Sequence, residues 1–201
     1  MIRILLADDQ ALVRGALAAL LDLEPDLEVV ASVATGDAVV PAALSVRPDV
    51  ALIDVQMPGL DGLAAAAALH RARPETRIVI LTTFGRPGYL ARAMAAGAVG
   101  FVVKDATPEY LIDAIQRVHS GLRVVDPGLA AESLAAGASP LTARERDVLV
   151  AAAQGATVRD IARGLHLSEG TVRNHLSAAI GKTGARTSAE AARLAETNGW
   201  L

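Results

Sequence analysis

The feature that most constrains the fold is an alternation, over the first 120 residues, of short apolar runs with longer segments of helical spacing. The apolar runs are rich in Val, Ile and Leu and nearly continuous, as strands of a buried parallel sheet are. The segments between them are rich in Ala and Leu at helical spacing. This alternation predicts an α/β fold, with a doubly wound five-stranded parallel sheet that carries helices on both faces.

The predicted elements of this region follow from the boundaries of those runs. The strands are Ile2–Ala7, Leu27–Val33, Val50–Ile53, Ile78–Leu81 and Gly100–Val103. The helices are Ala11–Leu23, Gly36–Ser45, Leu60–Ala72, Pro87–Ala96 and Pro108–Ser120. Ligands of such sheets bind at the carboxyl ends of the strands, so the residues that follow the strands are the first candidates for a functional site.

Polar side chains follow four of the predicted strands. Asp8 and Asp9 follow the first strand, Asp54 the third, Thr82 the fourth and Lys104 the fifth. Three carboxylates at close range repel one another unless a cation lies among them. A hard divalent cation that takes oxygen ligands and keeps several waters fits this set, and Mg²⁺ fits it best.

Lysine at position 104 is unusual for this chain, because only Lys104 and Lys182 among its nineteen basic residues are lysines. A lysine ammonium is a compact charge that suits a phosphoryl oxygen, and the Thr82 hydroxyl is a further donor. With the carboxylates, these groups predict phosphoryl transfer to a carboxylate nucleophile. Taken singly, an Asp or Thr after a strand is more often a cap, and a strand-end Lys a surface charge. The functional interpretation is favoured because all of them fall at one edge of one sheet.

The pattern changes after residue 120. Residues 121–140 contain Asp126-Pro127-Gly128 and read as a linker, with a short helix at Leu129–Ala136. From Leu141 to the end the pattern is helical, and four helices are predicted. Thr142 opens the first with a capping box, and Thr157 and Ser168 cap the second and third. The fourth helix runs from about Thr187 to Thr197. The chain is therefore divided into domains at residues 1–120 and 141–201.

The second and third of these helices have the dimensions of a helix-turn-helix, with the turn at Leu165–Leu167. The spacing predicts that Arg173, Asn174 and Ser177 face outward from the longer helix. Arg can bind guanine and Asn can bind adenine through paired hydrogen bonds, so these residue types suit base reading. The alternative is a plain helical bundle with a solvated polar face.

Charge is divided unevenly between the two regions. Residues 1–120 hold ten basic and fourteen acidic side chains, whereas residues 140–201 hold eight and six. The resulting charge of +2 on the second region is small for a DNA-binding domain, so one copy is expected to bind DNA weakly.

The order of Asp8-Asp9, Asp54, Met57-Pro58-Gly59, Asp61-Gly62, Thr82 and Lys104 resembles the receiver domain of bacterial response regulators. The expected sheet is then of the flavodoxin-like type. The resemblance implies that Asp54 is the phosphoacceptor and that Asp8 or Asp9, Asp54 and the backbone carbonyl of Gln56 ligate Mg²⁺. It also implies that Lys104 holds the phosphoryl group, that Thr82 moves to meet it and that Phe101 is the switch aromatic. Many receivers carry proline after the lysine, whereas this chain has Asp105, and Phe101 has no hydroxyl.

The segments Leu141–Leu149 and Leu167–His175, with Lys182, resemble the LuxR-type helix-turn-helix. The whole chain thus resembles the NarL/FixJ class of response regulators, and Thr82–Tyr89 with the C-terminal segments resembles the branch that includes the desaturase regulator DesR. The resemblance implies that Arg173, Asn174 and Ser177 contact bases and that Lys182 contacts a backbone phosphate. Members usually carry basic residues where Ser177 and Ser188 stand, which implies fewer phosphate contacts here.

These features together predict a cytoplasmic transcription factor without a signal peptide or membrane insertion. A sensor histidine kinase would phosphorylate Asp54 with Mg²⁺, and homodimers would then bind paired half-sites on double-stranded DNA, with RNA polymerase as a further candidate partner. The rival is a Mg²⁺-dependent phosphohydrolase. Such enzymes usually place an Asp two residues past the nucleophile as acid/base, where this chain has Gln56, so it is not expected to be a turnover enzyme. A receiver that works without phosphorylation is a third possibility, against which the complete acidic pocket argues.

Overall fold

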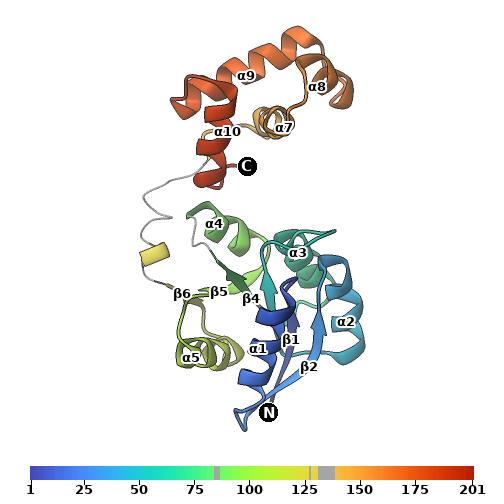
Figure 1. Cartoon of the computed structure of the whole chain (residues 1–201), viewed down its shortest axis with the longest axis vertical. Coiled ribbons are helices and arrows are strands. Elements are labelled where there is room, and N and C mark those ends of the chain that lie inside the picture. The colour runs from blue at the N-terminus through green and yellow to red at the C-terminus, as the bar shows by residue number, and fades with distance from the viewer. Residues whose placement is uncertain (84–86, 127, 131–138) are drawn as a thin grey trace. The chain divides into compact units, whose positions relative to one another are not determined.

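The computed structural model describes residues 1–83, 87–126, 128–130 and 139–201 (Figure 1). The chain divides into two compact units, an α/β unit that ends near residue 130 and a helical unit that ends at Leu201. The predicted helix Leu129–Ala136 extends into residues 131–138, which lie outside the described residues. No described helix is long and apolar enough to cross a membrane.

The α/β unit is built on a parallel sheet whose strands lie in the order β2-β1-β3-β4-β5-β6. The strands are β1 (Ile2–Ala7), β2 (Leu27–Val33), β3 (Val50–Asp54), β4 (Arg77–Thr82), β5 (Ala98–Val103) and β6 (Val124–Val125). The parallel α/β prediction is confirmed, and the first five strands have the flavodoxin-like order.

The sixth strand differs from the prediction of five strands and of a linker that begins at residue 121. β6 pairs with Gly100 and Phe101 at the open edge of the sheet. Two valines are too short a run to carry a strand pattern in the sequence, so only the pairing with β5 reveals them as part of the sheet.

Helices cover the sheet on both faces (Figure 1). They are α1 (Ala11–Leu21), α2 (Val39–Val46), α3 (Gly62–Ala72), α4 (Pro87–Ala95) and α5 (Pro108–His119), with a 3₁₀ turn at Gly36–Ala38 before α2. Helix α3 begins two residues later than predicted, because the Asp61 carboxylate accepts the backbone N–H of Ala64 and caps the helix there.

The core of this unit is aliphatic, since aromatic residues make up only 2% of the chain. Strands β1, β3 and β4 are buried along nearly all of their length. Ile4, Leu6 and Leu52 from the sheet pack with Leu21 of α1 and Ile115 of α5 in one cluster. Burial on both faces holds these strands, and therefore their carboxyl ends, in fixed positions.

The helical unit contains α7 (Ala143–Ala153), α8 (Val158–Gly164), α9 (Glu169–Thr183) and α10 (Ser188–Thr197), as predicted. Each begins after a hydroxyl residue whose oxygen accepts a backbone N–H of the first turn; these residues are Thr142, Thr157, Ser168 and Thr187. Ile161 and Val172 are buried between α8 and α9. His166, in the turn between them, has a φ of 55°.

Candidate functional site

The sheet order brings the polar strand ends together. β1 and β3 are neighbours, with Ala7 opposite Ile53, so Asp8 and Asp54 follow in adjacent positions. β4 lies on the other side of β3, with Leu81 opposite Asp54. β5 comes next, with Val103 opposite Thr82, which places Lys104 just beyond. The site therefore lies at the carboxyl edge, beside the point where the strand order reverses, as open α/β sheets favour.

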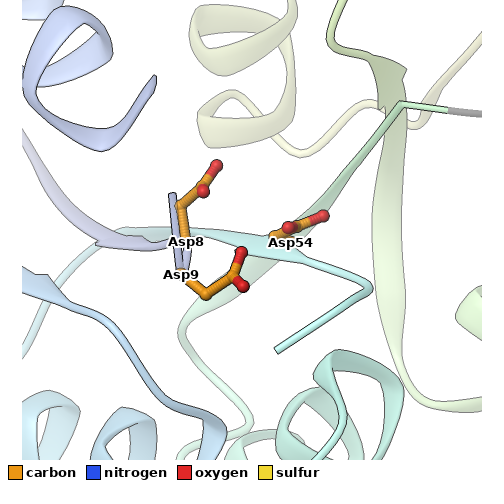
Figure 2. Close-up of side chains that lie close together, drawn as sticks. All are labelled: Asp8, Asp9 and Asp54. Atoms are coloured by element: carbon orange, nitrogen blue, oxygen red, sulfur yellow. The ribbon is translucent and has the colours of Figure 1, made fainter. Parts of the chain in front are cut away.

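The three carboxylates gather at this edge, as Figure 2 shows. Oxygens of Asp8, Asp9 and Asp54 lie within 4.8 Å of one another. Asp8 is fully buried and Asp54 is 3% exposed, whereas Asp9 is exposed and gives the pocket access to solvent. An all-oxygen set of anionic ligands with one open side is compatible with Mg²⁺, which keeps several of its waters when bound.

The Lys104 ammonium bridges the two buried carboxylates. Its Nζ lies 2.8 Å from Asp8 Oδ2 and 2.9 Å from Asp54 Oδ2, and its side chain is 9% exposed. The Lys104 backbone N–H donates to the carbonyl of Thr82 at 2.7 Å, which fixes the residue against the end of β4. With one ammonium and three carboxylates, the pocket keeps a net negative charge, which a divalent cation can balance.

Burial and neighbouring charges shift the pKa values of this pocket. Burial raises the pKa of the Asp54 carboxyl above its ordinary value; Lys104 opposes this, and the charge of Asp8 adds to it. Burial acts to lower the pKa of Lys104, but hydrogen bonds and charge from Asp8 and Asp54 outweigh it and raise that pKa. Lys104 is therefore held as a cation beside the carboxylate that is the candidate nucleophile.

Three further predicted residues, Thr82, Gln56 and Phe101, belong to the same unit. Thr82 ends β4 and is 6% exposed. The Gln56 side chain is exposed, and its backbone N–H donates to the Asp54 carboxylate. Phe101 of β5 is fully buried in the sheet. No cis peptide bond occurs among the described residues, so the Lys104–Asp105 bond is trans.

The loop between β3 and α3 is held by a residue that the sequence did not single out. The Asp37 carboxylate accepts the backbone N–H of Leu60 at 3.3 Å and lies directly against Gly59, which has a φ of +76°. At Gly62, a Cβ would lie 1.8 Å from the carbonyl oxygen of Asp54, so only glycine allows this close approach. Asp37 thus helps to fix the loop that follows the candidate nucleophile.

In the helical unit, α9 presents the polar residues that the sequence placed on its outer side. Arg173, Asn174 and Ser177 are exposed, while Val172 is buried. Arg173 Nη2 pairs with Glu169 Oε2, one turn earlier, at 3.0 Å. Both side chains are well exposed, so this pair is weak and can be exchanged for another partner.

Lys182, in the last turn of α9, has a different environment from Arg173. Its ammonium donates to both oxygens of Glu145, at 2.9 and 2.7 Å. Glu145 belongs to the first turn of α7, and its carboxylate also accepts the backbone N–H of Thr142. The hydrogen bond from Lys182 lowers the pKa of Glu145 below its ordinary value. The two residues are 37 positions apart, so no local sequence pattern reveals the pair.

Comparison with known proteins gives consistent matches to both units. The family described as response regulator receiver domain matches residues 4–116, and that described as bacterial regulatory proteins, luxR family, matches residues 139–195. The uncharacterised transcriptional regulatory protein YvfU of Bacillus subtilis (strain 168) is 43% identical over 201 residues, covering all of both chains. The transcriptional regulatory protein DesR of the same strain is 42% identical, again over all of both chains.

A crystal structure of the response regulator ChrA, from a heme-sensing two-component system, is similar over 100% of this chain and 98% of that one. Its TM-score is 0.59 and its sequence identity is 32%. The likeness therefore extends across both units, and the resemblance to the branch that includes DesR is confirmed.

Proposed function

The chain belongs to the two-component response regulators that join a receiver domain to a LuxR-type DNA-binding domain, and on this basis we propose that phosphorylation of Asp54 switches its DNA binding. In this proposal residues 1–120, with β6 added to their sheet, receive the signal, the rest of residues 121–140 connects the domains, and residues 141–201 bind DNA. The observation that supports it most is the Lys104 ammonium, which lies within 2.9 Å of carboxylate oxygens of both Asp8 and Asp54.

In the proposed reaction, a carboxylate oxygen of Asp54 attacks the phosphorus of a phosphohistidine on a sensor histidine kinase. The new O–P bond forms as the P–N bond breaks, and the histidine leaves with the electron pair of that bond. Mg²⁺, held by Asp8, Asp9, Asp54 and the carbonyl of Gln56, would supply positive charge for the phosphoryl oxygens. Lys104 binds one of these oxygens, and catalysis consists of positioning and charge neutralisation.

The switch follows from the charges that the phosphoryl group adds to a buried pocket. Lys104 and the Thr82 hydroxyl are drawn to the new oxygens, and Phe101 adjusts by packing alone since it has no hydroxyl. These changes favour one of two conformations of the receiver and shift the population towards a dimer. In this proposal the protein acts in the cytoplasm, with the kinase and DNA as its partners and RNA polymerase as a further candidate partner.

In the proposed DNA complex, Arg173, Asn174 and Ser177 contact bases and Lys182 contacts a backbone phosphate. The small positive charge of residues 140–201 makes one copy a weak binder. When two copies are paired, binding of the second copy to its half-site becomes an intramolecular step. The affinity for the whole site then rises although each copy makes the same contacts as before. A two-fold dimer then recognises paired half-sites.

The phosphohydrolase alternative is disfavoured by the side chain two residues past Asp54. The Gln56 amide neither gains nor loses a proton near neutral pH, so it cannot act as the acid/base that activates water for hydrolysis. The aspartyl phosphate is therefore lost slowly, and the protein acts as a switch without turnover of a separate substrate.

Phosphorylation is expected to convert a monomer into a dimer. Sedimentation velocity of the full chain with Mg²⁺, before and after treatment with acetyl phosphate, measures this directly. We expect a faster-sedimenting species only in the treated sample, in proportion to the phosphorylated fraction. A sedimentation coefficient that does not respond to full phosphorylation would contradict the proposed dimerisation.

Arg173→Ala is expected to weaken binding to a specific site by roughly 1–3 kcal/mol per half-site and to relax sequence preference at one base pair. The reason is loss of the paired hydrogen bonds that a guanidinium makes to guanine. Titrations against the site and single-base variants of it, at fixed salt, measure both effects.

The matched control for that titration is Arg193→Ala, which removes an exposed arginine from α10. Arg193→Ala is expected to lower the affinity for every DNA sequence slightly and to a similar extent. If Arg173→Ala lowers the affinity for all DNA sequences by the same factor, Arg173 contacts a phosphate and not a base.

A further inference from the structure

Both lysines of this arginine-rich chain form ion pairs with carboxylates. The ion pair of Lys182 is relevant to DNA binding. Lys182 lies in the last turn of α9, the helix that carries the proposed base contacts, and it is the residue proposed to bind a backbone phosphate. Its ammonium already makes two hydrogen bonds to Glu145. An ammonium has three N–H donors, so one remains for a phosphate.

The Glu145–Lys182 pair differs from the other ion pairs of the helical unit. Pairs such as Arg144–Asp147, Arg163–Asp160 and Arg173–Glu169 join neighbouring turns of one helix or its cap, and all their side chains are about half exposed or more. Such pairs are screened by water and readily exchange partners. The Glu145 side chain is only 7% exposed, and its pair with Lys182 links α7 to α9.

Glu145 cannot follow Lys182 towards DNA. Its carboxylate is fixed by the capping box, in which it accepts the backbone N–H of Thr142 at 2.7 Å. A buried carboxylate that loses its cationic partner is strongly destabilised, so separation of the pair on DNA is unfavourable. Glu145 therefore fixes the position of the Lys182 ammonium, and its negative charge offsets the positive charge of the lysine.

We propose that Glu145 is a positioning residue that limits sequence-independent DNA binding, because it holds the Lys182 ammonium at the end of α9 and neutralises its charge. The inference rests on the proposed DNA-binding function. Each phosphate that a protein cation neutralises releases counterions and makes the dependence of affinity on salt steeper. A lysine that shares its charge with a buried glutamate contributes less to this release than a free one. The weak domain thus depends more strongly on pairing through the receivers.

The test is a salt titration of the unphosphorylated full chain on a duplex of random sequence and fixed length. The proteins are the wild type, Glu145→Gln, Lys182→Gln and the double variant. Glutamine at position 145 keeps the shape and an oxygen for the Thr142 N–H but removes the charge. We expect Glu145→Gln to bind more tightly and to steepen the plot of log affinity against log salt by up to about 0.9.

Lys182→Gln is expected to flatten the salt plot more in the Glu145→Gln background than in the wild-type background. Equal flattening of about 0.9 in both backgrounds would overturn the proposal, since Lys182 would then be a full phosphate contact regardless of Glu145. If the pair acts on stability alone, the variants change the free energy of unfolding but leave the salt plots parallel. Parallel plots would therefore also overturn the proposal.

Folding of each variant is followed by the fluorescence of Trp200, the single tryptophan, which is partly buried and packs against the core of the helical unit. If Glu145→Gln does not fold, Lys182→Gln decides alone. Flattening by a small fraction of 0.9 supports the proposal, and flattening by the whole of it contradicts it. Absence of any wild-type binding at low salt would instead overturn the proposed DNA-binding function.

Discussion

Asp54→Asn is expected to abolish phosphate uptake, so intact-mass spectrometry after treatment with acetyl phosphate and Mg²⁺ should show only unmodified protein. The carboxylate of Asp54 lies 2.9 Å from Lys104 and within reach of two further carboxylates that can hold Mg²⁺. An amide is a poor nucleophile and leaves the pocket with one fewer negative charge. The expected effect is complete because Asp54 is the proposed phosphoacceptor, and the amide that replaces its carboxylate does not attack phosphorus.

The matched control is Asp61→Asn, in the same loop region. Asp61 caps α3 by accepting the backbone N–H of Ala64, and asparagine caps helices about as well as aspartate. This variant should take up phosphate like the wild type. Full labelling of Asp54→Asn under the same conditions would mean that another residue is the phosphoacceptor.

Lys104→Arg is expected to remove most of the response to phosphorylation although it keeps the positive charge. The ammonium fits between Asp8 and Asp54 in a pocket where only 9% of its side chain is exposed. A planar guanidinium is larger and cannot occupy the same place against one phosphoryl oxygen. We expect the gain in DNA affinity on phosphorylation to fall by roughly tenfold or more, a loss of about 1.4 kcal/mol.

The comparison requires equal phosphorylation of the wild type and Lys104→Arg, as measured by intact mass. DNA affinity is then measured for both proteins with and without phosphate. If the two gains are equal, Lys104 is only a structural partner of Asp8 and Asp54 and has no part in the switch.

The candidate pocket could be located from the sequence because its charged and hydroxyl residues end a strand or follow one closely. The carboxyl ends of parallel strands lie at one edge, so correct strand boundaries bring Asp8, Asp54, Thr82 and Lys104 together. What the sequence could not show is the partner of Lys104 within this edge. That it bridges Asp8 and Asp54 depends on the side-chain packing of three strands.

Contacts between distant segments were the least predictable part of the fold. The two residues of β6 join the sheet only because β5 offers an edge for them. Asp37 contacts the loop between β3 and α3 at Leu60, 23 residues later, and Glu145 contacts Lys182 across 37 residues. Local spacing predicts which side of a helix is exposed, as it did for Arg173 and Asn174. It does not predict which charged group lies opposite.

Titration of one operator with the unphosphorylated and the phosphorylated full chain tests the central claim most directly. The operator is first obtained by selection from random-sequence duplexes, and salt is held constant. We expect the phosphorylated protein to bind as a dimer, with an affinity about a hundredfold or more above that of the unphosphorylated monomer. If the unphosphorylated monomer binds as tightly as the phosphorylated form, phosphorylation of Asp54 does not control DNA binding.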